Sequence, residues 1–214
     1  MGSLEEQIWG RLSKAWLAWV LLVLVILIYL WVAGFDGVVF GPDRSTLLKY
    51  GSLCTKNVDS GEFWRLSTSL FLHGDLLHLG LNAVALLVLC RMAESVFGVV
   101  STLGLFYFSG LLGAFLSWAM GAPNTVGASG AIFGLLTALS TFGWKYKREL
   151  PEELGITLRK KLSLFGFLNL ILGLLILRLA NFSQFRVSLS LSVSNDLLKL
   201  EKIPEYVNSN NFTK

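Results

Sequence analysis

One serine between two glycines is the residue of this 214-residue chain best placed to do chemistry. Ser129 lies in the sequence Gly127-Ala128-Ser129-Gly130, where a turn gives way to an uncharged apolar stretch. A hydroxyl at the start of a helix lies near backbone N–H groups that have no intrahelical partner. The position indicates a candidate nucleophile, although glycines at this spacing are also typical of close helix packing alone.

Two polar side chains interrupt an earlier apolar stretch. His78 and Asn82 are four residues apart, so on a helix they lie on one face, and Asp75 before them is a plausible N-cap. His73 lies just outside this helix. Polar groups inside membrane helices usually face the bundle interior, either in a functional site or in hydrogen bonds between helices. A zinc site is disfavoured because no His-Glu-x-x-His pattern is present.

The composition excludes several classes of protein. Apolar residues make up 54% of the chain and charged residues 15%, whereas soluble domains carry about 25% charge. Two cysteines, Cys54 and Cys90, are too few for a disulfide scaffold. The net charge of +4 without basic runs interleaved with aromatics argues against nucleic-acid binding. A channel or transporter would need more polar groups along its spans than this chain has.

The apolar stretches predict an all-α polytopic membrane protein. A spanning helix needs about 20 mostly apolar residues. On this basis five transmembrane helices are expected, near residues 15–33, 76–92, 99–119, 127–143 and 162–178. Residues 1–14 would form a cytoplasmic N-terminus, residues 15–180 a membrane domain and residues 181–214 a polar, poorly ordered tail.

Lysine and arginine in short loops predict the orientation. They gather before the first span, between the second and third, and between the fourth and fifth, so this side is expected to be cytoplasmic. The loop of residues 33–70 and the turn of residues 121–126 then lie on the outer side, and Ser129 opens toward it. Arg65 and Glu94 fall at opposite faces of the membrane, where each is expected to anchor the chain at the surface.

Taken together, these residues resemble the rhomboid family of intramembrane serine proteases. The resemblance covers about residues 16–177 and rests on the order and spacing of Trp64-Arg65, His73-Gly74, His78, Asn82, Glu94, Gly98 and Gly127-Ala128-Ser129-Gly130. It implies a rhomboid-like helical bundle, integral and multi-pass, in the cell or inner membrane if the source is bacterial. Its partners would be the lipid bilayer and membrane proteins with a transmembrane segment, which it would cleave. No cofactor, metal or nucleic acid would be involved.

The resemblance also implies roles for individual residues. Ser129 is the expected nucleophile, and His78 and Asn82 are expected to stabilise the oxyanion together with the Ser129 backbone N–H. Gly127 and Gly130 would shape the backbone of the motif. The remaining residues of the pattern would be structural: His73, Trp64, Arg65, Glu94 and Gly134.

The chain departs from the family pattern at the general base. In rhomboids this base is a histidine on a sixth helix, but the only histidines here are His73 and His78, and no sixth apolar span is visible. The expectation is an impaired protease with a truncated, frameshifted or altered end. The alternatives are a non-catalytic pseudoprotease that binds membrane proteins and an active enzyme with another base. Without the missing helix, the glycine face of the 127–143 helix is expected to stay unpacked and to lower stability.

Overall fold

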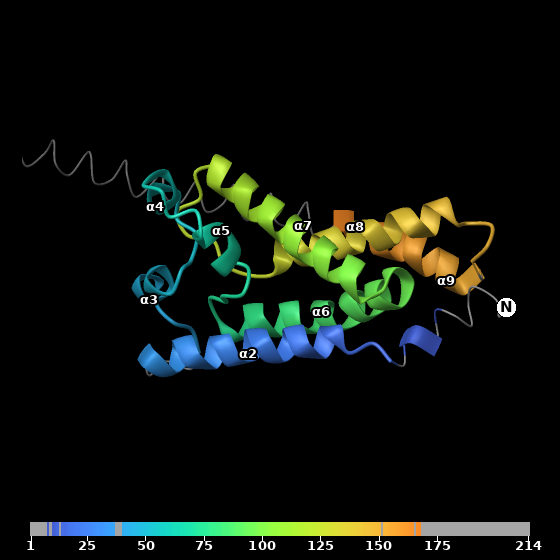
Figure 1. Ribbon diagram of the computed structural model, residues 1–214, viewed down its shortest axis with the longest axis horizontal. Coiled ribbons are helices and arrows are strands. Elements are labelled where there is room, and N and C mark those ends of the chain that lie inside the picture. The colour runs from blue at the N-terminus through green and yellow to red at the C-terminus, as the bar shows by residue number, and fades with distance from the viewer. Residues whose placement is uncertain are drawn as a thin grey trace, which may run out of the picture. The chain divides into compact units, whose positions relative to one another are not determined.

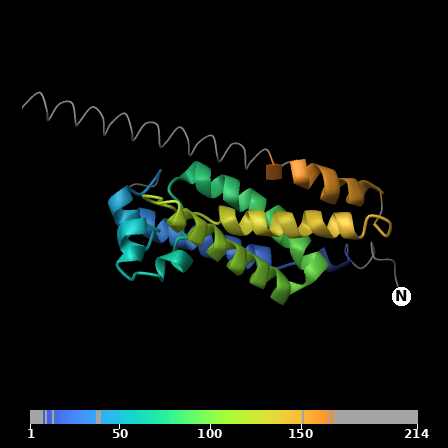
Figure 2. The ribbon, with the colours of Figure 1, turned by 90° about the horizontal axis from the view of Figure 1, so that it is seen from above.

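A computed structural model describes residues 8, 10–12, 14–36, 40–150, 152–164, 166 and 167, all but the last within a compact unit of residues 1–166. Their backbone is helical, and no strand longer than an isolated bridge occurs among them. Four long helices lie side by side (Figures 1 and 2): α2 (Leu17–Asp36), α6 (Leu76–Phe97), α7 (Val99–Ala119) and α8 (Ser129–Lys145). The shorter elements are α3 (Arg44–Lys49), α4 (Thr55–Asp59), α5 (Arg65–Thr68), α9 (Glu152–Ile156) and the π-helical turn η1 (Thr157–Lys161).

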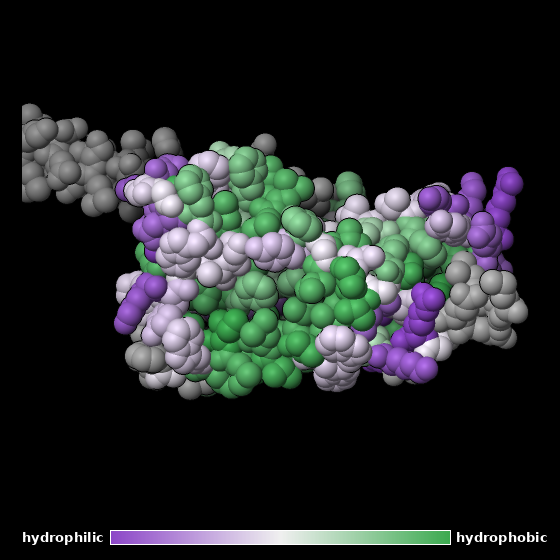
Figure 3. Space-filling model, in the orientation of Figure 1, coloured by the Kyte–Doolittle hydropathy of each residue, from purple (hydrophilic) through white to green (hydrophobic). Residues whose placement is uncertain are grey.

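Three helices in the described residues are long and apolar enough to cross a membrane. They cover residues 10–34, 76–97 and 99–119. The fourth predicted span, α8, has 17 residues, or about 26 Å of helix, slightly less than an apolar layer of about 30 Å. Most of the fifth predicted span and the whole predicted tail lie outside the described residues, so the five-span count stays a prediction. The face drawn in Figure 3 is apolar over its middle and hydrophilic toward its two ends.

The two ends of the bundle differ in structure. One end, here called the loop end, carries α3, α4 and α5 together with the turn of residues 121–128 (Figure 1). The loop expected between the first two spans therefore contains three short helices. The other end, here called the basic end, carries α9, η1 and the final turns of α6 and α8.

The sequence suggested that Glu94 anchors the chain at the membrane surface, but the structure shows that it is a buried helix cap. Its side chain is 6% exposed and accepts hydrogen bonds from Trp16 N at 3.1 Å and Leu17 N at 2.9 Å. These are orphan N–H groups at the start of α2, where a negative charge is favourable. Glu94 therefore joins the end of α6 to the beginning of α2.

The glycine face of α8 is packed, which corrects the expectation that it would be bare. A β-carbon on Gly130 would lie 3.3 Å from the Cα of Gly113 in α7, so the two backbones are in close contact. At Gly134 the space of a β-carbon is filled by the side chain of Ser109, also from α7. The partner of this face is thus a helix already present in the predicted bundle.

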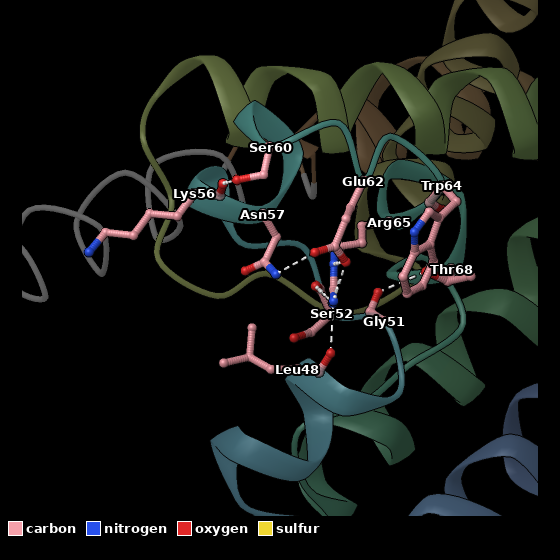
Figure 4. A network of polar contacts seen from close by, with 10 residues as sticks. All are labelled: Leu48, Gly51, Ser52, Lys56, Asn57, Ser60, Glu62, Trp64, Arg65 and Thr68. Atoms are coloured by element: carbon pink, nitrogen blue, oxygen red, sulfur yellow. Dashed lines mark hydrogen bonds and ion pairs between the residues drawn. The ribbon is translucent and has the colours of Figure 1, made fainter.

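Arg65 is also buried rather than anchored at a surface. It is 6% exposed, forms an ion pair with Glu62 at 2.6 Å, and donates from Nη1 to the carbonyl oxygens of Leu48 at 2.7 Å and Ser52 at 3.0 Å (Figure 4). Its guanidinium lies 4.6 Å from the centre of the Trp64 ring. One arginine thus ties α3, the segment after it and the start of α5 into one unit.

Candidate active site

Ser129 is the first residue of α8, at the loop end of the bundle. Its side chain is exposed and makes no hydrogen bond to any of the described residues. Ile132 N donates to Ala128 O, which closes the first turn, so the backbone N–H groups of Ser129 and Gly130 precede the first intrahelical bond. The hydroxyl is therefore exposed at the helix start, where backbone N–H groups have no intrahelical partner.

His78 contacts the turn that leads into this serine. A β-carbon on Gly127 would lie 2.7 Å from Cε1 and 2.8 Å from Nε2 of the His78 ring, so the imidazole packs directly on the glycine. Gly127 has φ +115°, a conformation that side chains with a β-carbon rarely adopt. Because two residues along the chain span at most about 7 Å, this contact places the imidazole close to Ser129. The helix begins at Ser129, so Gly127 lies before it and does not continue the Gly130–Gly134 face.

Asn82 lies one turn after His78 on the same helix. Its Nδ2 donates to the His78 backbone oxygen at 2.9 Å, and its side chain is 8% exposed. An amide carries two N–H groups, so this bond leaves one for a further acceptor. The N-cap expected at Asp75 is confirmed, since its Oδ1 accepts from His78 N at 2.7 Å. That cap fixes the start of α6 and therefore the position of both polar side chains.

His73 packs behind His78. It is 2% exposed, its ring meets the His78 ring edge-on with centroids 5.2 Å apart, and neither nitrogen makes a well-formed hydrogen bond within the described residues. Burial, and then the neighbouring His78, lower the pKa of His73 from 6.5 to about 4. His73 is therefore neutral near pH 7 and supports the His78 ring from behind.

The turn before Ser129 is held by residues of the loop end that are distant in sequence. Leu53 and Thr125 exchange two backbone hydrogen bonds, at 3.0 and 2.8 Å. Thr55 donates from both N and Oγ1 to the Ala122 oxygen, and Gly127 N donates to Ser69 O at 2.9 Å. No pattern in the sequence had indicated these contacts, because each joins segments more than 55 residues apart. These hydrogen bonds fix the backbone of the turn and therefore the position of Ser129.

Arg65 is connected to the turn before Ser129 through Ser52. Its contact with the Ser52 carbonyl lies next to Leu53, the residue that pairs with Thr125. Arg65 is thus connected to the Leu53–Thr125 bridge through Ser52, and the Trp64 ring packs on the Arg65 guanidinium. In the described part of the chain, no group of three His, Cys, Asp or Glu side chains is arranged to hold a metal ion.

Known proteins of similar sequence match this chain over part of its length. Residues 60–190 match the Rhomboid domain. The chain is 39% identical over 107 residues to RHOMBOID-like protein 5 of Arabidopsis thaliana, which covers 49% of this chain and 35% of that protein. It is 37% identical over 143 residues to RHOMBOID-like protein 6, mitochondrial, of the same plant (63% and 44% covered). It is 34% identical over 97 residues to Rhomboid protease GluP of Bacillus subtilis (strain 168), with 45% and 19% covered. The chain thus spans less than half the length of these relatives.

Proposed function

The chain belongs to the rhomboid family, and from this premise we propose that it is an intramembrane serine endopeptidase with Ser129 as its nucleophile. The observation that carries the proposal is the contact of the His78 ring with Gly127, two residues before Ser129. It supports a site in which an imidazole and a serine hydroxyl from two different helices face one substrate carbonyl.

The proposed chemistry is acyl transfer to serine. The Ser129 Oγ loses its proton to water and attacks the carbonyl carbon of a peptide bond, and the carbonyl oxygen becomes negatively charged. The carbon–nitrogen bond then breaks and the amine leaves with a proton. Water hydrolyses the ester on Ser129, which releases the carboxylic acid product and restores the hydroxyl. The Ser129 backbone N–H, the His78 ring and the second N–H of Asn82 are the proposed donors to the negatively charged carbonyl oxygen. Donors preorganised toward a developing charge contribute about 3 kcal/mol each. Gly127 and Gly130 provide the backbone shape and the room for this arrangement.

No histidine of these 214 residues is available as the general base. A serine hydroxyl needs a base to become a good nucleophile. The two histidines of the chain are His73, which is buried and has a pKa of about 4, and His78, assigned here to the oxyanion. We propose that the chain as given hydrolyses peptides slowly. In subtilisin, loss of the catalytic triad leaves about 10³–10⁴-fold acceleration over water, which sets the scale.

The same observation favours a second candidate function. A rhomboid-like protein without a base in place can bind membrane proteins without cleaving them. In either case the proposed partners are the lipid bilayer and membrane proteins with a transmembrane segment, and neither a cofactor nor a metal is invoked. The proposed setting is a multi-pass membrane protein whose loop end faces outward, as the distribution of lysine and arginine predicts.

The two candidates are separated by cleavage of a single-span model substrate in lipid bilayers. For the protease, slow cleavage is expected that disappears in Ser129→Ala and persists in Ser101→Ala, which changes an exposed serine on α7. Free imidazole should accelerate the reaction, because it can serve as the base. Binding of the substrate without any Ser129-dependent cleavage, with or without imidazole, would favour the pseudoprotease instead.

A further inference from the structure

The basic end of the bundle contains an apolar cavity that the proposed protease chemistry does not use. Its volume is about 110 Å³. The walls come from three parts of the chain: the N-terminal residues Ile8 and Leu12, the last turns of α6, and the α9–η1 segment with Leu154 and Leu158. The one polar lining residue, Ser95, donates its hydroxyl hydrogen to the Met92 carbonyl at 2.8 Å. An apolar cavity of this kind stays dry and takes up apolar groups.

In each part of the chain that builds this cavity, an arginine stands next to a lining residue in the sequence. Arg11 precedes the lining residue Leu12, Arg91 precedes Met92, and Arg159 follows Leu158. The exposed Lys160 and Lys161 follow in the π-helical turn η1.

The hydrogen bonds of these arginines do not use all of their N–H groups, so further N–H groups can bind an anion. Arg91 donates from Nη2 to Leu12 O at 3.2 Å, so its guanidinium lies beside one of the lining residues. Arg159 donates from Nε to Gly155 O and from Nη1 to Lys147 O, and a guanidinium has five N–H groups in all. The nearest carboxylate on α6, that of Glu94, is occupied by the two backbone N–H groups of α2. The cations near the cavity are thus not neutralised by that acid.

We propose that the basic end binds an anionic phospholipid, with a few methylene groups of an acyl chain in the cavity and the phosphate headgroup on Arg11, Arg91 and Arg159. An apolar cavity beside a cationic rim matches a molecule that is apolar at one end and negative at the other. Basic pockets between membrane helices on the cytoplasmic side bind anionic headgroups in this way. A zwitterionic lipid offers the chain without the net charge, and a free phosphate offers the charge without the chain.

Lipid retention by the purified full chain in detergent tests the proposal. Phosphatidylglycerol and phosphatidylcholine with identical acyl chains are offered together, and the bound lipid is measured by native mass spectrometry. At least a fivefold preference for phosphatidylglycerol is expected, and millimolar glycerol 3-phosphate should not displace it. Equal retention of the two lipids, or displacement by glycerol 3-phosphate, would overturn the proposal.

Variants then separate the two halves of the site. Arg11→Gln combined with Arg159→Gln should abolish the preference, whereas Lys56→Gln, which removes an exposed cation at the loop end, should keep it. Val96→Phe fills the cavity and should lower retention of both lipids, and Leu154→Phe serves the same purpose if the first variant does not fold. Full preference in the double arginine variant, or unchanged retention in a folded cavity-filled variant, would contradict the assignment.

Discussion

The imidazole ring of His78 occupies the space that a β-carbon on Gly127 would need, with its Cε1 and Nε2 only 2.7 and 2.8 Å from that position. This relationship joins α6 to the turn before Ser129 and strongly favours glycine at position 127. Two reasons therefore favour a glycine two residues before the serine: the His78 ring leaves no room for a β-carbon, and the backbone has a positive φ.

Gly127→Ala is therefore expected to damage the site beyond the cost of its backbone strain. A residue with a β-carbon at φ +115° is strained by about 1–3 kcal/mol, and the added methyl group must also push the His78 ring away. Gly61→Ala is the matched control, because Gly61 has φ +100° and nothing within 4 Å of a β-carbon. Cleavage and thermal unfolding should both be measured. If the two variants lose cleavage equally, the contact with His78 does not matter for the site.

Glu94→Ala should destabilise the fold by about 2–4 kcal/mol, because two backbone N–H groups at the start of α2 lose a charged acceptor. Glu94→Gln should lie between this variant and the wild type, since one amide oxygen remains as an acceptor. Chemical unfolding in mixed micelles gives the comparison, with the exposed Glu152→Ala as the control that leaves stability unchanged. Equal stability of Glu94→Ala and Glu152→Ala would show that the cap is unimportant.

Arg65→Lys is expected to lower the free energy of unfolding by about 2 kcal/mol or more and to reduce cleavage as well. A lysine cannot reproduce the fork that contacts Glu62, Leu48 and Ser52 together. The reduction in cleavage follows because Ser52 adjoins the Leu53–Thr125 bridge that holds the turn before Ser129. Arg148→Lys, at an exposed position of the basic end, should behave like the wild type. Full activity of the Arg65→Lys protein would show that the hydrogen bonds of Arg65 are not needed to position Ser129.

His73 should make stability fall on mild acidification. Its pKa is about 4 in the folded chain and near 6.5 when unfolded, so the unfolded chain binds a proton first as the pH falls. The contribution of neutral His73 is complete above pH 6.5, declines between 6.5 and 4, and amounts to at most about 3 kcal/mol. Hydrogen bonds lower the pKa values of Asp43 and Glu62. The stability that these two carboxylates contribute is therefore lost only when the pH falls to their ordinary pKa values of 3.8 and 4.5. Thermal unfolding from pH 7.5 to 4.5 should decline less in His73→Gln; an identical decline would refute the assignment.

Local features of the fold could be predicted from the sequence. The predicted third span coincides with α7, and the Asp75 cap places His78 and Asn82 on one face as expected. These succeed because apolar runs, N-caps and the four-residue repeat are all decided within a few residues.

Long-range contacts could not be predicted. Glu94 reaches the start of α2 from more than 75 residues away, and the hydroxyl of Ser109 fills the space beside Gly134; neither leaves a local signal. The ion pair of Arg65 did have one, because Glu62 lies three residues before it. At Gly127 the sequence suggested helix, but the positive φ and the His78 ring place the helix start at Ser129.

Labelling by a fluorophosphonate probe tests most directly whether Ser129 carries a chemically reactive hydroxyl. Peptide mapping by mass spectrometry should find the phosphonyl group on Ser129, attached slowly and faster when imidazole is added. The label should be absent in Ser129→Ala and unchanged in Ser101→Ala. Labelling of the Ser129→Ala protein at the wild-type rate, or modification of another serine instead, would contradict the assignment.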